Sequence, residues 1–255
     1  MKGSCDTVMQ RLAVFSLVGS NRGSISSFSL TRHSKRERDI LQALDSKLLK
    51  KDIFGRVSLI HSEAGPLIRR DTRGAPVPVR WIARRLLARE ARTLAVLEEL
   101  EGIPVLLRSD KSTLDRSYVD GVPMQEGQPG HIQYFHAAAR LIRRMHRLGV
   151  VHNDLAKEPN FLLTSDGKPA IIDFQLSWCA RQRGPLFRTL AREDIRHLLK
   201  HKRTYCPDRL TRREKTILDN PSMLSKLWMM TGKPVYLLIT RKILGWQDRE
   251  GAGDR

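Results

Sequence analysis

The chain has 255 residues, of which 40% are hydrophobic and 29% are charged. This composition is ordinary for a globular protein and excludes a chain that is disordered throughout. Lysine and arginine number 46 against 27 aspartates and glutamates, so the net charge is +19, which indicates an anionic partner such as a nucleotide, a nucleic acid or an acidic membrane surface.

Cysteine usage and the N-terminal segment indicate the setting of the protein. The three cysteines lie far apart and form no CxxC pair, so neither a disulfide framework nor a zinc site is expected, and a reducing cytoplasmic setting fits. No apolar run approaches the roughly 20 residues that a membrane-spanning helix needs. Residues 1–36 are rich in serine and arginine, so we expect a disordered tail there, although a targeting peptide has a similar composition.

The first expected elements are a short helix and a β-hairpin. The helix spans 37–49, and the hairpin consists of two apolar runs within 56–72 that the residues SEAG separate. A long helix follows over 79–102, because its apolar residues recur at helical spacing and Gly102 provides a stop.

Glu90 lies in the middle of the apolar stripe of this long helix. Burying an unpaired carboxylate costs several kcal/mol, so we expect a cation beside it. Arg69 and Arg70, at the end of the preceding strand, are the candidates. The alternative is that this end of the helix projects beyond the core and Glu90 meets water.

The second half of the chain is expected to be mainly helical. Strand-like runs at 103–109 and 115–124, the latter with a turn at Asp120-Gly121, precede a long helix over 131–149 that has one apolar and one arginine-rich face. This order of elements indicates an α+β protein with two lobes: a small β-rich N-lobe over 37–118 and a short helical C-lobe over 119–255.

The segment 150–175 carries the candidate site. Within it, FLL and PAIID are short strand-like runs that flank TSDGK, and Asp-Gly is a strong signal for a two-residue hairpin turn. With Asp166 and Gly167 in the turn, Asn160 stands directly opposite Asp173. Two oxygen-bearing side chains so placed can share Mg²⁺, which prefers carboxylate, amide and phosphate oxygens.

Asp154 lies on the loop that enters this hairpin. A carboxylate beside a metal-phosphate site is well placed to accept a proton from an attacking hydroxyl group. The alternative is a surface turn at Asp-Gly with Asp154 capping a helix. The joint spacing of Asp154, Asn160 and Asp173 favours the functional interpretation.

The sequence HNDLAKEPN, followed by IIDFQ, resembles the catalytic loop and metal-binding motif of the protein-kinase-like superfamily, H-R-D-L-x-x-x-N and D-F-G. Within it, the chain is most similar to small bacterial lipopolysaccharide core-sugar kinases of the Kdo kinase type and to RIO kinases. The resemblance covers about residues 40–200 and is strong at 150–175. It implies a bilobal fold and an ATP- and Mg²⁺-dependent kinase.

The resemblance also implies roles for individual residues. Asp154 resembles the catalytic base. His152 resembles the histidine that packs under the metal-binding loop, and we group His152 with the catalytic residues. Asn160 and Asp173 resemble the Mg²⁺ ligands. The nucleotide-binding positions it implies are Glu90 on the long helix, Arg69 in place of the phosphate-binding lysine, Gly55 in the loop over the phosphates, and Tyr118 and Asp120 in the adenine-reading hinge.

Several positions depart from the kinase pattern. The interval from Asp154 to Asn160 is one residue longer than usual, so a bulge has to absorb it. Asn153 replaces the usual arginine, so switching by a phosphorylated activation loop is not expected. Gln175 replaces the glycine of D-F-G, which restricts the backbone there. Asp194, in a later helix, is expected either to hold the catalytic-loop backbone or to meet solvent.

The expected function is transfer of the γ-phosphate of ATP to a hydroxyl acceptor, either a lipopolysaccharide sugar or a protein serine or threonine. The first alternative is a catalytically silent, nucleotide-binding scaffold, and the second is a basic RNA-associated protein related to RIO kinases. Nucleic acid is not the expected partner, because no stacking platform or recognition helix is evident. The basic, aromatic-bearing segment 227–250 can either lie on an anionic membrane surface, at the inner face of the cytoplasmic membrane, or complete a small core.

Overall fold

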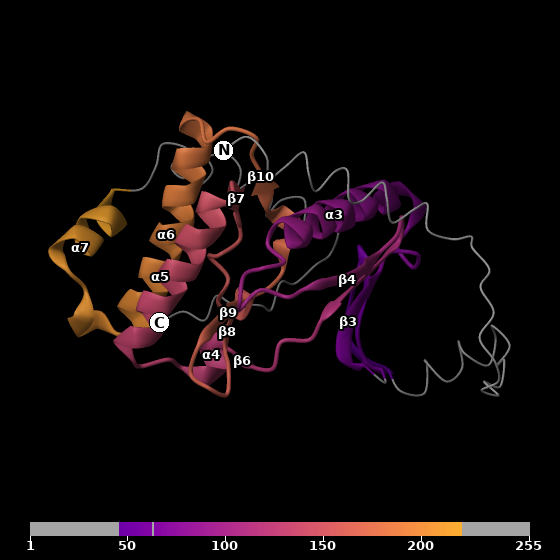
Figure 1. Cartoon of the computed structure of the whole chain (residues 1–255), viewed down its shortest axis with the longest axis horizontal. Helices are drawn as coiled ribbons and strands as arrows, with labels where there is room; N and C mark the ends of the chain where they lie inside the picture. The colour runs from indigo at the N-terminus through magenta and orange to yellow at the C-terminus, as the bar shows by residue number, and fades with distance from the viewer. Residues whose placement is uncertain (1–45, 63, 221–255) are drawn as a thin grey trace, which may run out of the picture. The chain divides into compact units, whose positions relative to one another are not determined.

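The computed structural model describes residues 46–62 and 64–220, which have a mixed α+β structure (Figure 1). The α+β class expected from the sequence is confirmed. The chain divides into two compact units, one with residues up to Glu98 and Pro104–Tyr118, the other with Glu99–Ile103 and residues from Val119 onward. The predicted tail and the basic C-terminal segment lie outside the described residues. Within the described part of the chain, no helix is long and apolar enough to cross a membrane.

The first unit contains a five-stranded antiparallel sheet with the order β1-β2-β3-β5-β4. Its strands are β1 (Ser46–Asp52), β2 (Gly55–Ser62), β3 (Gly65–Asp71), β4 (Leu106–Ser109) and β5 (Thr113–Ser117). The expected hairpin is confirmed as β2 and β3.

The expected helix over 37–49 is wrong for its last four residues. Residues 46–49 belong to β1, and the remainder of the predicted helix lies outside the described residues. The strand forms because its backbone groups pair with β2 in an antiparallel ladder, from Ser46 opposite Ile60 to Asp52 opposite Gly55. Pairing in the sheet overrides the weak local preference for a helix.

Helix α3 (Val77–Val96) packs against β4 and β5 through the apolar stripe that the sequence predicts. It ends at Val96, so the expected stop at Gly102 is wrong. Gly102, in the second unit, has a φ of +86°, and a Cβ there would lie 2.9 Å from the carbonyl oxygen of Pro169. The glycine is therefore required by close backbone contact and not by a helix end.

The second unit is built on α5 (Ile132–Arg147) and α6 (Pro185–Tyr205), which pack against each other, with α7 (Arg212–Asp219) against α6 (Figure 1). The long helix expected over 131–149 is confirmed as α5. The buried face of this helix is Tyr134, Phe135, Ala138, Leu141, Ile142 and Met145.

Two small antiparallel sheets complete the second unit. One has the order β6-β8-β9, and the other pairs β10 with β7. Their strands are β6 (Val122–Pro123), β7 (Val150–Val151), β8 (Phe161–Leu163), β9 (Pro169–Ile171) and β10 (Trp178–Cys179). The short helices are α4 (Met124–Gly127), η1 (Glu158–Asn160), η2 (Phe174–Leu176) and η3 (Pro207–Arg209). The turn expected at Asp120-Gly121 is not found, because the chain there is irregular and leads directly into β6.

Candidate functional site

The loop that carries Asp154 connects β7 to η1 and β8, and helix α6 holds its beginning. Asp194 of α6 is buried, and its carboxylate accepts hydrogen bonds from the backbone N–H of His152 at 2.9 Å and of Asn153 at 3.0 Å. The Nε2 atom of His146 lies 3.0 Å from the same carboxylate. Of the two roles expected for Asp194, the structure therefore confirms the one in which it holds the loop backbone.

Helix α6 also contacts the middle of this loop, seven residues further along the same face. His201 is buried and its Nε2 lies 2.8 Å from the carbonyl oxygen of Leu155. Burial lowers the pKa of His201, which favours the neutral ring. Tyr205 donates a hydrogen bond of 3.0 Å to the carboxylate of Glu158. The loop is thus attached to one rigid helix at three places.

Asp154 lies between an amide and an ammonium group. The Nδ2 of Asn160 donates to the backbone oxygen of Asp154 at 2.8 Å and to its Oδ2 at 3.2 Å. The Nζ of Lys157 lies 3.1 Å from the same Oδ2, and the side chain of Asp154 is 14% exposed. Asp154 and Asn160 are therefore brought together, as the sequence predicts.

The extra residue between Asp154 and Asn160 is absorbed by two consecutive turns. The N–H of Lys157 bonds to the carbonyl oxygen of Asp154 at 3.4 Å, and the N–H of Asn160 bonds to that of Lys157 at 3.3 Å. The second turn is the 3₁₀ helix η1. Sequence reasoning missed Lys157, although a lysine three residues after the candidate base was a usable signal.

His152 contributes to the site without reaching its surface. Its side chain is fully buried, its Nε2 lies 3.0 Å from the carbonyl oxygen of Ile172, and its ring packs 4.7 Å from that of Phe174. These contacts hold the segment on either side of Asp173. His152 therefore packs beneath the segment that carries Asp173, as the resemblance implies, and its grouping with the catalytic residues stays a prediction.

The register expected for the β8-β9 hairpin is wrong by one residue. The observed partners are Phe161 with Ile171 and Leu163 with Pro169, which extends to Asn160 opposite Ile172 and not Asp173. The N–H of Ile172 accordingly bonds to the carbonyl oxygen of Asn160 at 3.0 Å.

The physical reason for this shift is the loop of the hairpin. The N–H of Gly167 bonds to the carbonyl oxygen of Thr164, and the N–H of Thr164 bonds to the carbonyl oxygen of Lys168, which closes a three-residue loop. Gly167 has a φ of +76°, the left-handed conformation that such a loop requires at its third position. The Thr164 hydroxyl also donates to the Asp166 carboxylate and stabilises this longer turn.

Asp173 follows the paired part of β9 and has a left-handed backbone, with a φ of +65°. Gln175, in place of the glycine of D-F-G, donates from Nε2 to Asp173 Oδ1 at 2.7 Å. Asn153, in place of arginine, has a φ of +65° and donates to the carbonyl oxygen of Leu176 at 3.1 Å. Both departures from the kinase pattern therefore make specific contacts around Asp173.

Asn160 and Asp173 supply side-chain oxygens of the kind that a hard cation binds. Because Asn160 uses Nδ2 to bind Asp154, its Oδ1 remains as an acceptor, and no described residue donates to it. Asp173 supplies a carboxylate one residue beyond Ile172, whose N–H bonds to the carbonyl oxygen of Asn160. Residues 46–62 and 64–220 contain no group of three or more His, Cys, Asp or Glu side chains arranged to hold a metal ion.

In the first unit, Glu90 is fully buried and lies between two arginines. Arg70 Nε is 3.4 Å from Glu90 Oε2, and Arg116 Nη1 is 3.2 Å from Glu90 Oε1. Neither contact has hydrogen-bond geometry, so opposite charge alone compensates the buried carboxylate. The expectation of a cation beside Glu90 is confirmed.

Of the two arginines expected as candidates for the cation beside Glu90, Arg70 is confirmed and Arg69 is not. Side chains alternate between the two faces of a strand, so Arg69 and Arg70 of β3 point in opposite directions. Arg69 stands opposite Asp115 of β5 and binds its carboxylate with two hydrogen bonds of 2.7 and 2.8 Å. Sequence reasoning did not find Arg116, because β5 becomes a neighbour of α3 only in the folded sheet.

The other three nucleotide-binding candidates lie at the edges of elements. Gly55 begins β2 after the β1-β2 turn, with a φ of +135°, and a Cβ there would overlap the carbonyl oxygen of Asp71. Tyr118 and Asp120 are exposed on either side of the point where the chain passes from the first unit to the second.

Comparisons of the chain with models of protein families and with curated proteins found no match.

Proposed function

We propose that the protein is an ATP- and Mg²⁺-dependent phosphotransferase with a kinase-like bilobal fold, which moves the γ-phosphate of ATP to a hydroxyl acceptor. The observation that carries the proposal is the environment of Asp154. Its carboxylate lies between the Asn160 amide and the Lys157 ammonium, on a loop whose backbone the buried Asp194 holds. Phosphoryl transfer depends mainly on such positioning and on neutralisation of charge.

In the proposed reaction, Asp154 orients the acceptor hydroxyl and accepts its proton. The hydroxyl oxygen bonds to the γ-phosphorus while the bond from that phosphorus to the β-γ bridging oxygen breaks, and ADP leaves. Lys157, with its Nζ beside Asp154, neutralises negative charge on the transferred group. The hydrogen bond from Asn160 keeps the Asp154 carboxylate in one orientation.

The donor set fits Mg²⁺, which requires oxygen ligands. Asn160 Oδ1 and the Asp173 carboxylate would hold the ion. When bound, Mg²⁺ supplies positive charge to the phosphate groups of ATP. Gln175 restrains the Asp173 carboxylate through its 2.7 Å hydrogen bond.

The ion pairs around Glu90 suggest how the first unit takes part in binding the phosphates of ATP. Arg70 has the position on β3 from which a cation reaches the helix glutamate, so we assign it the role of the phosphate-binding lysine. An arginine can bind a phosphate with two parallel hydrogen bonds, whereas lysine acts as a point charge.

The acceptor belongs to one of two classes: a lipopolysaccharide core sugar, to which the closer resemblance points, or a protein serine or threonine. Such a sugar acceptor is consistent with a protein that acts at the inner face of a bacterial cytoplasmic membrane. The net charge of +19 also favours association with that anionic surface.

A catalytically silent scaffold is the second candidate. Two observations favour it: β3 carries arginines where kinases have a lysine, and Asp154 is already paired with Lys157. Such a scaffold binds ATP but transfers no phosphate.

The experiment that tests the proposal measures Mg²⁺-dependent ATP binding and phosphate transfer from labelled ATP, offering core-sugar acceptors and protein substrates separately. We compare the native chain with Asp154→Asn and Asp173→Ala, and use Asp208→Asn on η3 as a matched control, since Asp208 is exposed. We expect Asp154→Asn to lower turnover by about 10²–10⁴-fold with ATP binding retained, because it removes the base.

The remaining variants separate the two candidates. Asp173→Ala is expected to abolish the Mg²⁺-dependent part of ATP binding, and Asp208→Asn to leave binding and turnover unchanged. ATP binding without turnover in the native chain would favour the scaffold. Native turnover that Asp154→Asn leaves intact would contradict the assigned base.

A further inference from the structure

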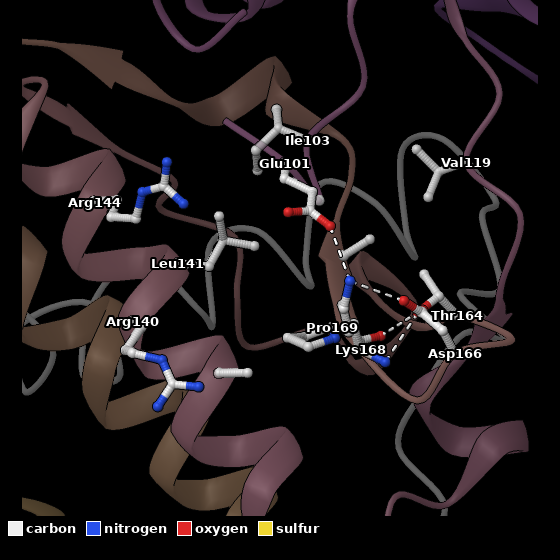
Figure 2. A pocket seen from close by; sticks show the side chains of 13 residues that line it. Glu101, Ile103, Val119, Arg140, Leu141, Arg144, Thr164, Asp166, Lys168 and Pro169 are labelled. Atoms are coloured by element: carbon white, nitrogen blue, oxygen red, sulfur yellow. Dashed lines mark hydrogen bonds and ion pairs between the residues drawn. The ribbon is translucent and has the colours of Figure 1, made fainter. Parts of the chain in front are cut away.

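A pocket in the second unit lies outside the residues assigned to phosphate transfer. It has a volume of about 380 Å³, and its walls come from α5, from residues 101–103 and from the hairpin residues 164–170 (Figure 2). None of its lining residues belongs to the proposed catalytic or metal-binding set. A volume of this size suits a small molecule, since small-molecule sites occupy roughly 300–1,000 Å³.

Arg140 and Arg144 of α5 line one side of this pocket. They are four residues apart, so they lie on one face of the helix about 6 Å from each other along its axis. Both are exposed, and neither forms a hydrogen bond or ion pair with any residue that the structure describes. Two like charges on neighbouring turns repel each other, so an anion bound between them is stabilised.

The other charged groups of the pocket already compensate one another. Lys168 Nζ lies 3.1 Å from Glu101 Oε1 and 3.0 Å from Asp166 Oδ2, and both contacts appear as dashed lines in Figure 2. These carboxylates raise the pKa of Lys168. An acidic ligand therefore finds its cations on the helix side, whereas Glu101 and Asp166 are occupied by Lys168.

Apolar groups form the surface between these two charged sides. Leu141 projects from α5 between the two arginines, and Ile103 and Pro169 contribute further apolar surface (Figure 2). Ile103 and Pro169 are buried, so this surface belongs to the packed part of the unit. A ligand that fits both features has an anionic group and an apolar body.

We propose that this pocket binds a small organic anion, in which a phosphate or a carboxylate lies between Arg140 and Arg144 and an apolar body covers Leu141, Ile103 and Pro169. Guanidinium groups suit both anions, because they bind phosphate and carboxylate with two parallel hydrogen bonds. The site is independent of the proposed reaction.

The probes are phenyl phosphate and benzoate, with inorganic phosphate as the anion without an apolar body. Binding to the full chain is measured by isothermal titration calorimetry. The key variant is Arg140→Gln/Arg144→Gln, and the matched control is Arg143→Gln/Arg147→Gln. The control removes the same charge from exposed residues of the same helix that do not line the pocket.

We expect phenyl phosphate, benzoate or both to bind the native chain more tightly than inorganic phosphate does. The pocket variant should weaken this binding at least tenfold, the control variant less than twofold, and Asp173→Ala should leave it unchanged. The tighter of the two aromatic probes identifies the preferred anion.

Three results would overturn the proposal. They are no binding of either aromatic probe at millimolar concentration, equal weakening by the two arginine double variants, and loss of binding in Asp173→Ala, which would place the probe at the phosphate-transfer site. Circular dichroism of each variant verifies that it is folded.

Discussion

At the scale of single residues, Gly55 and Gly65 separate two effects of a glycine. Both have φ values that side-chain-bearing residues rarely adopt, +135° and +111°. A Cβ at Gly55 would overlap the carbonyl oxygen of Asp71 on the neighbouring strand, whereas a Cβ at Gly65 would meet nothing within 4 Å. Gly55 thus carries a steric requirement in addition to a conformational one.

We predict that Gly65→Ala lowers the free energy of unfolding by about 1–3 kcal/mol, through backbone strain alone. Gly55→Ala should lower it by clearly more, because β2 and β3 also have to separate. Urea denaturation followed by circular dichroism measures both values. Equal losses in the two variants would show that the close contact with Asp71 does not add to the cost of the Gly55 substitution.

Asp194 is the residue on which the backbone of the loop that carries Asp154 depends. Its carboxylate accepts two backbone hydrogen bonds, from His152 and Asn153, in a buried setting. Asn at this position has the same shape but offers only one acceptor atom, so one N–H loses its partner.

We predict that Asp194→Asn lowers the free energy of unfolding by about 1–3 kcal/mol, the cost of leaving a buried donor unsatisfied. The matched control is Asp219→Asn, at an exposed position in α7. Its free energy of unfolding, measured in the same way, should change by less than about 0.5 kcal/mol. A loss in the control as large as in Asp194→Asn would contradict the argument.

At the scale of elements, the alternation of side chains along β3 decides which arginine serves Glu90. Arg70 faces α3 together with Arg116, whereas Arg69 pairs with Asp115 on the other face. The ion pairs therefore follow from strand geometry, and two adjacent arginines have different energetic roles.

A double-mutant cycle tests this assignment. We predict a coupling energy of about 1–3 kcal/mol between Arg70→Met and Glu90→Gln, because the two groups are in direct contact. The cycle of Arg69→Met with Glu90→Gln should give a coupling energy of about 0.5 kcal/mol or less. Chemical denaturation of the single and double variants measures both coupling energies. The reverse order of the two coupling energies would instead identify Arg69 as the partner of Glu90.

The expectations at this scale succeeded where a pattern is local. Periodicity predicted α3 and α5, and two apolar runs around a turn predicted the β2-β3 hairpin. They failed for β1, where pairing with β2 overrode local preference, and for the β8-β9 register, where Thr164 and Gly167 favoured a three-residue loop. Period alone cannot distinguish loops that differ by one residue.

At the scale of the whole molecule, histidines that are largely shielded from water make stability depend on pH. Burial, followed by the charge of Lys200, lowers the pKa of His197 from its usual 6.5 to about 4, and its buried Nδ1 has no hydrogen-bond partner among the described residues. The unfolded chain thus binds a proton at a higher pH than the folded chain. Stability from this group is fully present above pH 6.5 and is lost as the pH falls toward 4.

We predict that His197 contributes about 2 kcal/mol to the loss of stability between about pH 7 and pH 5. Urea denaturation of His197→Leu at the two pH values should show a correspondingly smaller loss than the native chain. His136→Gln, at an exposed position on α5, should behave like the native chain. An unchanged loss in His197→Leu would assign the pH dependence to other groups, among them His201, whose pKa is also lowered by burial.

The sequence by itself determined the α+β class, the main helices and the three residues of the candidate site, because local patterns and motif spacing express them directly. Tertiary structure alone decided that Arg70 and Arg116 lie beside Glu90, that Asp194 and His201 hold the loop that carries Asp154, and that Lys157 lies beside Asp154. These contacts depend on which faces of a strand and a helix meet and on how a loop absorbs one extra residue. Such choices are made by packing and backbone hydrogen bonding over the folded unit, and not by any short stretch of the chain.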